Sequence, residues 1–503
     1  MRTVVDIHCH TFNGDDLPVR GFVRNVHMEG KPYGDALASL VDALVQKKAP
    51  GYEDELRRLD SLLAQVLAMP VPVAANESLD GAEPLVADSV VPELDAVVEA
   101  ELHELAATNP YLLEAAAVAV KETAGDTLRT DESIGDWGPA AVRGTRWAAI
   151  YASSRLDNTV HLVRQFKDSV DLFTPMLVDL EFGLNDRAKT TVMQQVELQE
   201  RISRLSMLGG LPGVKRARVH PFVGFDPRRE VLSAKCGDPI GALDTIKLAV
   251  ERYGFVGVKL YPPMGFRPLN NETKNDGPPG QDGAAVDAVL RKLYEWCLAE
   301  DVPVTAHCNI SNGAREAYDE FSDPDDWKTV LEQFPGLHLN LGHFGGMRAL
   351  DEGTWPRKIA ALATEPSPKT EQAQNPPLTT GQSLHADVAN HRNDQPEFTM
   401  YMTQLRDLFD APETGTMAGR LMYGTDWYML AILPNLDTFM DTYRTAYQDT
   451  FPKETFPGAV DAFFGDRALS FLGFDDAQNR NCVRLRTRYE KYAPMRMPSW
   501  LSS

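Results

Sequence analysis

The 503-residue sequence has few cysteines, no long apolar run and no excess of basic residues. No stretch of about 18 apolar residues occurs, so no membrane span is expected. The formal charge of −22 and the lack of a Lys/Arg stripe argue against a nucleic-acid partner, because phosphate binding needs clustered cations. The five cysteines have no paired spacing and no signal-peptide pattern precedes the first strand pattern, so we expect free thiols and a cytoplasmic location. The expected partner is a small-molecule substrate, and homo-oligomerisation is left open.

The first strand pattern carries two histidines. An apolar, β-branched run turns polar at His8-Cys9-His10, which is typical of a buried strand that ends in a site. Because side chains alternate along a strand, His8 and His10 leave on one face and Cys9 on the other. Two neutral imidazoles that converge in this way can bind one divalent metal ion. A His-x-His pair also arises by chance, so the motif needs support from the rest of the chain.

The segment 33–146 lacks strand patterns and shows apolar residues at helical spacing. Helices are predicted at 33–47, 52–69, 92–107 and 111–124. We interpret the segment as a helical insertion after the first strand, which either caps the site or serves in packing or oligomerisation. The predicted domains are a barrel formed by residues 1–32 and 147–475, the insertion at 33–146, and a C-terminal extension at 476–503. The Arg-rich run of the extension (Arg484, Arg486, Arg488) is expected to be a solvated helix face.

Strands and helices alternate from about residue 150 onward. Further strands are predicted at 171–179, 218–227, 255–261, 302–307, 337–343, 383–388 and 420–426, with helical patterns between most of them. Eight strand-plus-helix units with mainly apolar strands indicate the α/β class, and within it a (β/α)8 TIM barrel with a large helical insertion after strand 1. A doubly wound open sheet is the alternative, but no Gly-x-Gly-x-x-Gly turn follows the first strand.

Polar residues stand at the C-terminal ends of several predicted strands, where barrels of this type carry their catalytic groups. They are His8, His10, Lys259, His307, His343 and Asp426. Each one alone is more readily explained as a hydrogen-bonded or ion-paired structural residue, but together they favour a site. Three other histidines (His220, His338, His385) lie within or before strands and are expected to be structural.

Several short motifs occur in a fixed order along the chain. They are Asp6-Ile7-His8-Cys9-His10, Phe222-Val223-Gly224-Phe225-Asp226-Pro227-Arg228, Gly254-Phe255-Val256-Gly257-Val258-Lys259, Val304-Thr305-Ala306-His307, Leu341-Gly342-His343-Phe344-Gly345-Gly346, Tyr423-Gly424-Thr425-Asp426-Trp427 and Phe464-Gly465-Asp466-Arg467-Ala468-Leu469. This set resembles the amidohydrolase superfamily and is closest to the branch called amidohydrolase-related or amidohydrolase 2. The resemblance covers the first strand and most of residues 150–475, but neither the insertion nor the last residues.

The resemblance implies a site with one divalent metal, usually Zn²⁺ and sometimes Mn²⁺. The implied ligands are His8, His10, His307 and Asp426, and the implied catalytic groups are Asp426 and His343, which would transfer a proton. Three imidazoles, a carboxylate and an open position suit a catalytic zinc. In binuclear members of the superfamily a carbamylated lysine bridges two metals, and Lys259 could take that role, with His343 as a ligand. The Gly-x-Lys-x-x-Pro setting favours the mononuclear site.

The implied reaction is the metal-dependent hydrolysis of an ester, lactone or amide of a small, anionic substrate. Relatives with similar ligands decarboxylate or hydrate aromatic or unsaturated carboxylic acids, so a decarboxylase or lyase is the alternative. A non-catalytic metal-binding scaffold is a third reading. Lys259, Arg267 and Arg228 follow strand patterns in positions where they could clamp a substrate carboxylate, although surface ion pairs explain each arginine equally well.

Overall fold

The computed structural model describes most of the 503 residues. These are residues 2–22, 38, 42, 45–69, 85–87, 90–108, 139–166, 169–184, 186–236, 241–310, 313–348, 351, 353–364, 383–394, 397–411, 415–431, 433 and 435–501. The predicted helices at 33–47 and 111–124 lie largely or wholly outside these residues, as does the Pro- and Gln-rich stretch at 365–382.

The described strands pair in parallel and form two sheets, one of order β1-β2-β3 and one of order β4-β5-β6-β7-β8-β9. They are β1 (Val5–Cys9), β2 (Leu172–Pro175), β3 (Arg218–Val219), β4 (Phe222–Phe225), β5 (Gly257–Leu260), β6 (Val304–His307), β7 (Leu339–Gly342), β8 (Leu384–Asp387) and β9 (Leu421–Met422). Nearly every strand residue is buried, as expected for parallel strands covered on both faces. The predicted α/β class with parallel strands is therefore confirmed.

One predicted strand is divided in the structure. The run predicted at 218–227 forms β3 and β4, which are separated by His220 and Pro221. Proline has no backbone N–H and so cannot donate to a strand ladder, which explains an interruption at this point. A parallel bridge between Met176 and Phe222 connects the β2 side to β4. With β3 and β4 counted together, the nine strands correspond to the eight predicted ones.

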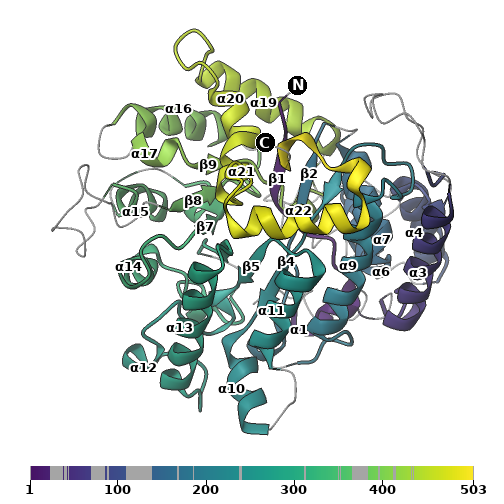
Figure 1. Cartoon of the computed structure of the whole chain (residues 1–503), viewed down its shortest axis with the longest axis horizontal. Helices are drawn as coiled ribbons and strands as arrows, with labels where there is room; N and C mark the ends of the chain where they lie inside the picture. Colours follow the sequence, from purple (N-terminus) through teal and green to yellow (C-terminus); the bar gives the residue numbers. More distant parts are fainter. Residues whose placement is uncertain are drawn as a thin grey trace.

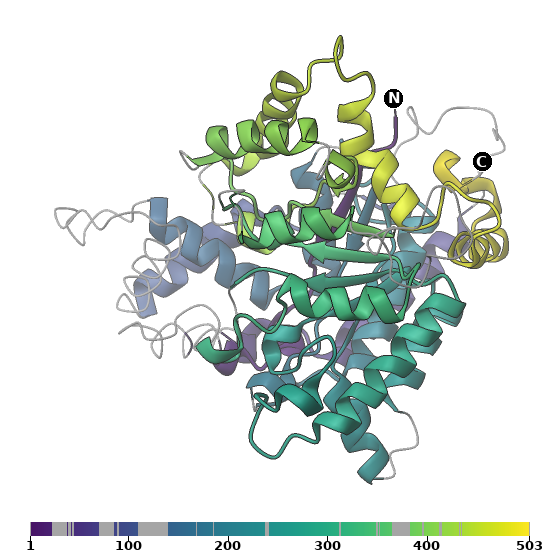
Figure 2. The same cartoon turned by 90° about the vertical axis from the view of Figure 1, so that its left-hand side faces the viewer.

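Helices surround the strands on the outside (Figures 1 and 2). In the N-terminal part they are α1 (Val19–Phe22), α3 (Tyr52–Ala68), α4 (Leu94–Thr108), α6 (Pro139–Ala152), α7 (Arg155–Gln165), α8 (Glu181–Leu184), α9 (Val192–Met207), α10 (Pro227–Cys236) and α11 (Ala242–Tyr253). In the C-terminal part they are α12 (Asn271–Lys274), α13 (Gly283–Ala299), α14 (Pro324–Gln333), α15 (Trp355–Leu362), α16 (Glu397–Asp410), α17 (Gly415–Ala418), α18 (Trp427–Leu430), α19 (Phe439–Thr450), α20 (Ala459–Asp461), α21 (Arg467–Phe471) and α22 (Arg480–Tyr492).

Local sequence signals set the ends of several helices. Helix α9 begins with a capping box in which Thr191 and Gln194 bond each other's backbone N–H groups. Helix α13 begins where Asp282 accepts a hydrogen bond from the backbone N–H of Ala285. Helix α11 ends at Gly254, which has a φ of 78° that glycine adopts without strain.

Helices α3, α4 and α6 lie together at one side of the molecule (Figure 1). Helix α3 packs on α9, and α4 packs on α6. Among the described residues, no helix combines the length and the apolar character that crossing a bilayer requires.

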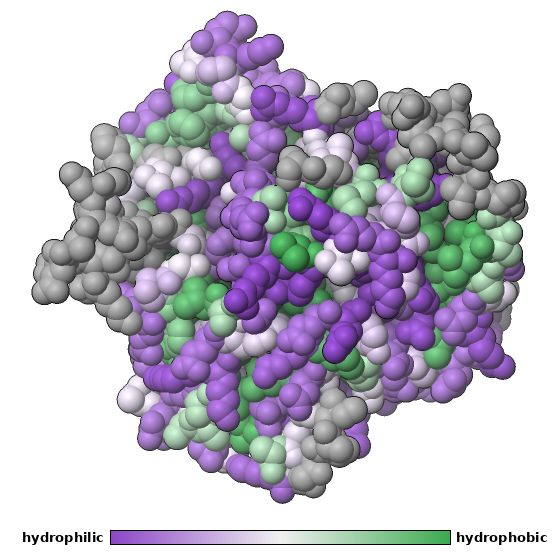
Figure 3. All heavy atoms as spheres, in the orientation of Figure 1, coloured by the Kyte–Doolittle hydropathy of each residue, from purple (hydrophilic) through white to green (hydrophobic). Residues whose placement is uncertain are grey.

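The Arg-rich C-terminal helix α22 differs from its expected role as a solvated face. Arg488 is 7% exposed, and its guanidinium donates to Glu200 of α9 (2.5 Å) and to the Arg252 carbonyl. Tyr489 joins a hydrophobic cluster with strand residues such as Leu172. Helix α22 thus packs on the strands with one face, while Figure 3 shows the outer surface around it as mainly hydrophilic.

Candidate metal centre

A cavity of about 50 Å³ lies where the C-terminal ends of β1, β5, β6 and β7 meet the segment after β9. This volume holds an ion together with a few water molecules. The lining residues are His8, His10, Phe12, Phe22, Tyr151, Val178, Leu180, Lys259, Tyr261, His307, His343, Asp426, Tyr428 and Met429. All six polar residues that the sequence places at strand ends therefore face one cavity.

His8 and His10 are held by their Nδ1 atoms. Nδ1 of His8 donates to Oδ2 of Asp387 (2.9 Å), and Nδ1 of His10 donates to the Met176 carbonyl (2.9 Å). Each imidazole then has its proton on Nδ1 and presents Nε2 as an acceptor, the usual state of a metal-ligating histidine whose other nitrogen is oriented by the protein. Burial lowers the pKa of His8 to about 4 and that of His10 to about 3, so both rings are neutral at pH 7.

Asp426 completes a group of three potential ligands. Its Oδ1 lies 3.4 Å from Nε2 of His10, and the ligand atoms of His8, His10 and Asp426 all lie within 4.8 Å of one another. The backbone N–H of Asp426 donates to the His8 carbonyl (2.7 Å). The adjacent Thr425 donates through its backbone N–H (3.0 Å) and its hydroxyl (2.6 Å) to the buried Asp6. These bonds tie the segment after β9 to β1, and the donor set fits a divalent metal ion.

His307 and His343 form a second pair beside this group. Nδ1 of His343 donates to the Ala389 carbonyl (3.0 Å), and Nδ1 of His307 lies 3.1 Å from Nε2 of His343. The ring of His307 stacks on Tyr261, with the ring centroids 4.4 Å apart. His307 faces the cavity but stands outside the compact group of His8, His10 and Asp426. The structure therefore brings three of the four expected ligands into one group.

Lys259 lies against the group of three potential ligands. Its Nζ is 3.1 Å from Nε2 of His8 and donates to it. Burial lowers the pKa of Lys259 to about 8, although Asp387 and Asp426 oppose this effect. Lys259 is 2% exposed and contributes an ammonium group to the cavity lining.

Asp387 at the end of β8 was not identified from the sequence. Besides His8, it accepts hydrogen bonds from the Asn340 side chain (2.7 Å) and from the backbone N–H groups of His343 (3.0 Å) and Ala389 (3.1 Å). Burial alone would raise the pKa of Asp387, but the adjacent His8 and these donors hold it well below its usual range. Asp387 thus orients both His8 and the backbone of His343. The rule that selects polar residues at strand ends would have found it.

The apolar half of the cavity wall was also missed. Phe12 stacks on Tyr428 (4.5 Å between ring centroids, 5° between planes), and Tyr151 packs beside both rings. Phe12 directly extends the first motif by two residues, which places it on the same face as His8 and His10. No local pattern links Tyr151 to this cavity, because its helix α6 spans the C-terminal boundary of the predicted insertion, far from the motifs at the strand ends.

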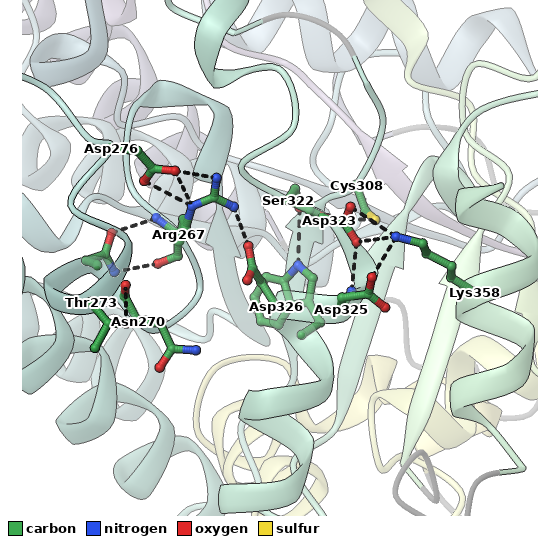
Figure 4. Close-up of polar contacts among 12 residues, drawn as sticks. Arg267, Asn270, Thr273, Asp276, Cys308, Ser322, Asp323, Asp325, Asp326 and Lys358 are labelled. Atoms are coloured by element: carbon green, nitrogen blue, oxygen red, sulfur yellow. Dashed lines mark hydrogen bonds and ion pairs between the residues drawn. The ribbon is translucent and has the colours of Figure 1, made fainter. Parts of the chain in front are cut away.

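Arg228 and Arg267 lie away from the cavity lining. Arg228 pairs with Asp226 and donates to the Met264 carbonyl (2.9 Å). Arg267 pairs with Asp276 (2.6 Å) and Asp326 (2.5 Å) and lies over the Phe321 ring, as Figure 4 shows for the two carboxylates. This differs from the expected carboxylate clamp, because the acidic loops of this chain supply each guanidinium with an internal partner.

The family model described as amidohydrolase matches residues 224–474 of the chain. Among solved structures, the chain resembles a protein from Pseudomonas putida assigned as a 2-pyrone-4,6-dicarboxylic acid hydrolase, with 15% identity, a TM-score of 0.34, and coverage of 62% of this chain and 86% of that one. A protein from Lactobacillus casei assigned as a metal-dependent hydrolase has 14% identity and a TM-score of 0.37, and the match covers 94% of this chain and 96% of that one. Dihydroorotase from Saccharomyces cerevisiae has 12% identity, a TM-score of 0.34, and coverage of 63% and 80%. No curated protein matches the chain.

Proposed function

The chain belongs to the amidohydrolase family and is an enzyme of amidohydrolase type, and from this premise we propose that it hydrolyses an ester, lactone or amide bond of a small, anionic substrate with one divalent metal. The observation that carries the proposal is the group formed by His8, His10 and Asp426 at the cavity floor, with both imidazoles oriented through Nδ1. A binding scaffold would not need His343 and Lys259 beside such a group.

We propose that the two parallel sheets close into one (β/α)8 barrel. Support comes from hydrogen bonds across both gaps between the sheets. The backbone N–H of Ile7 in β1 donates to the Tyr423 carbonyl after β9 (3.2 Å), and that of Leu177 after β2 donates to the Phe222 carbonyl in β4 (3.0 Å). A closed barrel would hold the strand ends that carry the site in fixed positions.

We propose Zn²⁺ as the metal, with Mn²⁺ as the alternative, held by His8, His10 and Asp426 and joined by His307. A bound divalent cation supplies Lewis acidity, which activates water and polarises a substrate carbonyl. His343, fixed by Ala389 and Asp387, accepts a proton from the attacking water and returns it to the leaving group. Lys259 holds the anionic group of the substrate. Arg228 and Arg267, which have carboxylate partners, stabilise loops instead.

Two alternatives have specific support. A binuclear site with carbamylated Lys259 is supported by the 3.1 Å contact between Lys259 Nζ and His8 Nε2. Because His8 is a proposed ligand, Lys259 is close enough to share a metal ion with it. Decarboxylation of an aromatic carboxylic acid is supported by the flat rings on the cavity wall, where Phe12 stacks on Tyr428 and Tyr261 stacks on His307. A planar substrate would fit between such rings, with its carboxylate toward Lys259.

We propose that residues 33–146 form a separate helical insertion, with 476–503 as the C-terminal extension. Within the described part of the chain, no residue of 33–146 lines the cavity. Its helix α3 instead reaches the barrel through Glu55, which pairs with Arg155 of α7 (2.7 Å). This contact supports a packing role for the described portion of the insertion.

The test is metal analysis combined with product analysis. We expect about one equivalent of divalent metal per chain, and turnover of at least one compound from a panel of lactones, esters, amides and aromatic carboxylates. His8→Ala should abolish both metal and turnover because it removes a ligand. His103→Ala, at an exposed position of α4, is the matched control and should retain both. Full activity without metal would overturn the proposal. Two equivalents of metal per chain would favour the binuclear site, and release of CO₂ would favour the decarboxylase.

A further inference from the structure

Tyr151 is a cavity residue that lies before the region matched by the family model. It lies in the last turn of α6 (Pro139–Ala152), whereas the family model begins at residue 224. Lys259, His307, His343 and Asp426 all lie inside the matched region and line the same cavity. The family match therefore assigns no role to Tyr151.

The Tyr151 ring is fixed by its neighbours. It is 2% exposed and packs edge-on against Trp147, with 4.6 Å between the ring centroids. Phe12 and Tyr428 lie on its other sides, with centroids 6.0 and 5.6 Å away. A tyrosine packed among three aromatic rings has little rotamer freedom, so its hydroxyl is held in one position.

The hydroxyls of Tyr151 and Tyr428 differ in their hydrogen bonding. The Tyr428 hydroxyl donates to the Phe12 carbonyl and accepts from the Asn158 side chain (3.1 Å). The Tyr151 hydroxyl makes no hydrogen bond within the described part of the chain, although buried tyrosine hydroxyls usually have a partner. Burial, together with the negative charge of Asp426 and the nearby Tyr261, raises the pKa of Tyr151 well above its ordinary value. The phenol is thus protonated at neutral pH and able to donate.

We propose that Tyr151 is a catalytic residue whose hydroxyl donates a hydrogen bond to an oxygen of the substrate bound in the cavity that Tyr151 shares with His8, His10 and Asp426. This inference rests on the proposed function for its substrate, which must carry an acceptor oxygen at the reacting group. Because Tyr151 and the ligand group line one cavity, the hydroxyl can stabilise negative charge that develops on that oxygen. Tyr151 also makes the C-terminal turn of α6 a part of the active site.

The test compares Tyr151→Phe with the wild type and with a matched control, Tyr443→Phe. Each variant removes one tyrosine hydroxyl that makes no hydrogen bond within the described part of the chain, but Tyr443 packs in α19 against Tyr423 and Phe463 and does not line the cavity. We expect Tyr151→Phe to retain full metal content and the wild-type melting temperature. On a substrate found in the panel, kcat/KM should fall about 10²–10³-fold, as for removal of an oxyanion donor. Tyr443→Phe should match the wild type.

Calorimetric titration of the metal-loaded proteins with phenylphosphonate provides a readout that does not depend on turnover. The tetrahedral anionic oxygens of this probe imitate a reacting centre that has gained negative charge. We expect the wild type and Tyr443→Phe to bind it, and Tyr151→Phe to bind about tenfold more weakly. Equal affinity in all three proteins, or no binding to the wild type, would overturn the role of Tyr151. A wild type without hydrolytic turnover would overturn the proposed function alone, because the probe still decides on Tyr151.

Discussion

Backbone strain occurs at residues of the candidate site. Asp426 has a φ of 52°, and His343 and Phe344 have φ values of 68° and 46°. Residues other than glycine rarely adopt these left-handed values, which persist only where surrounding bonds enforce them. The Asp387 carboxylate bonds the His343 backbone, and the His8 carbonyl bonds that of Asp426. The strained turns therefore point His343 and Asp426 into the cavity at a cost that these bonds offset.

We predict that His343→Asn retains the metal and loses turnover. Asparagine tolerates left-handed backbone better than most residues and can keep the contact with the Ala389 carbonyl, but it cannot exchange a proton. The expected fall in kcat is about 10²–10⁴-fold, measured with metal content determined on the same sample. Loss of metal in parallel with activity would make His343 a ligand and support the binuclear site. Near-normal turnover would contradict its role in proton transfer.

The residues that sequence reasoning found share one property, which is position at the end of an apolar run. His8, His307 and His343 follow such runs, and the structure places all three on the cavity wall. Asp387 at the end of β8 satisfies the same rule but was not selected. Tyr151 could not have been found, since nothing in a helix of residues 139–152 indicates which distant strand ends it faces. The expectation for Arg267 differed because loop carboxylates close in space are invisible in the sequence.

At the scale of elements, the order of strands and helices was predictable because apolar periodicity is local. Boundaries differed by a few residues, and β9 retains only Leu421 and Met422 of the strand predicted at 420–426. The rest of that run turns toward the site, where the backbone N–H and the hydroxyl of Thr425 donate hydrogen bonds to Asp6. The buried role of Arg488 depends on Glu200, nearly three hundred residues earlier. Tertiary partners of this kind do not appear in a local pattern.

The junction between β3 and β4 shows how such a partner acts. His220 is fully buried, with Nε2 3.0 Å from the Tyr489 hydroxyl of α22 and Nδ1 3.2 Å from the Ser203 hydroxyl of α9. Burial, with the positive charges of Arg488 and Arg218, lowers the pKa of His220 from 6.5 to about 3. The folded protein therefore keeps this histidine neutral where the unfolded chain protonates it.

We predict that His220 makes the fold sensitive to mild acid. Below pH 6.5 His220 is protonated in the unfolded chain but stays neutral in the folded protein. The free energy of unfolding therefore falls as the pH is lowered toward 3. The contribution of one such proton is at most about 1.4 kcal/mol per pH unit. In His220→Gln, urea unfolding at several pH values should give a slope that is smaller by about one proton in this window. An unchanged slope would show that other groups cause the acid sensitivity.

At the scale of the whole molecule, one buried arginine joins three segments that are far apart in the sequence. Arg155 of α7 donates to Asp16 after β1 (2.6 Å) and to Glu55 of α3 (2.7 Å), and all three side chains are fully buried. Thr190 also accepts from its guanidinium (2.9 Å). The described part of the insertion is thus attached to the same loop that follows His10. Composition and periodicity predicted the insertion as helical, but its attachment depends on this pairing across the fold.

We predict that Arg155→Met destabilises the whole protein rather than the insertion alone. It leaves Asp16 and Glu55 without their cation in a dry interior, which should lower the free energy of unfolding by about 3–5 kcal/mol. Burial already raises the pKa of both carboxyls, so without Arg155 they bind protons more readily when folded than when unfolded. The loss should therefore grow as the pH rises from about 5 to about 8, and denaturant unfolding at these two values measures it.

Arg58→Met is the matched control, because its pair with Asp157 is partly exposed and should contribute about 0–1 kcal/mol at either pH. If Arg155→Met loses no more than this control, the buried triad does not hold helix α3 to the rest of the fold.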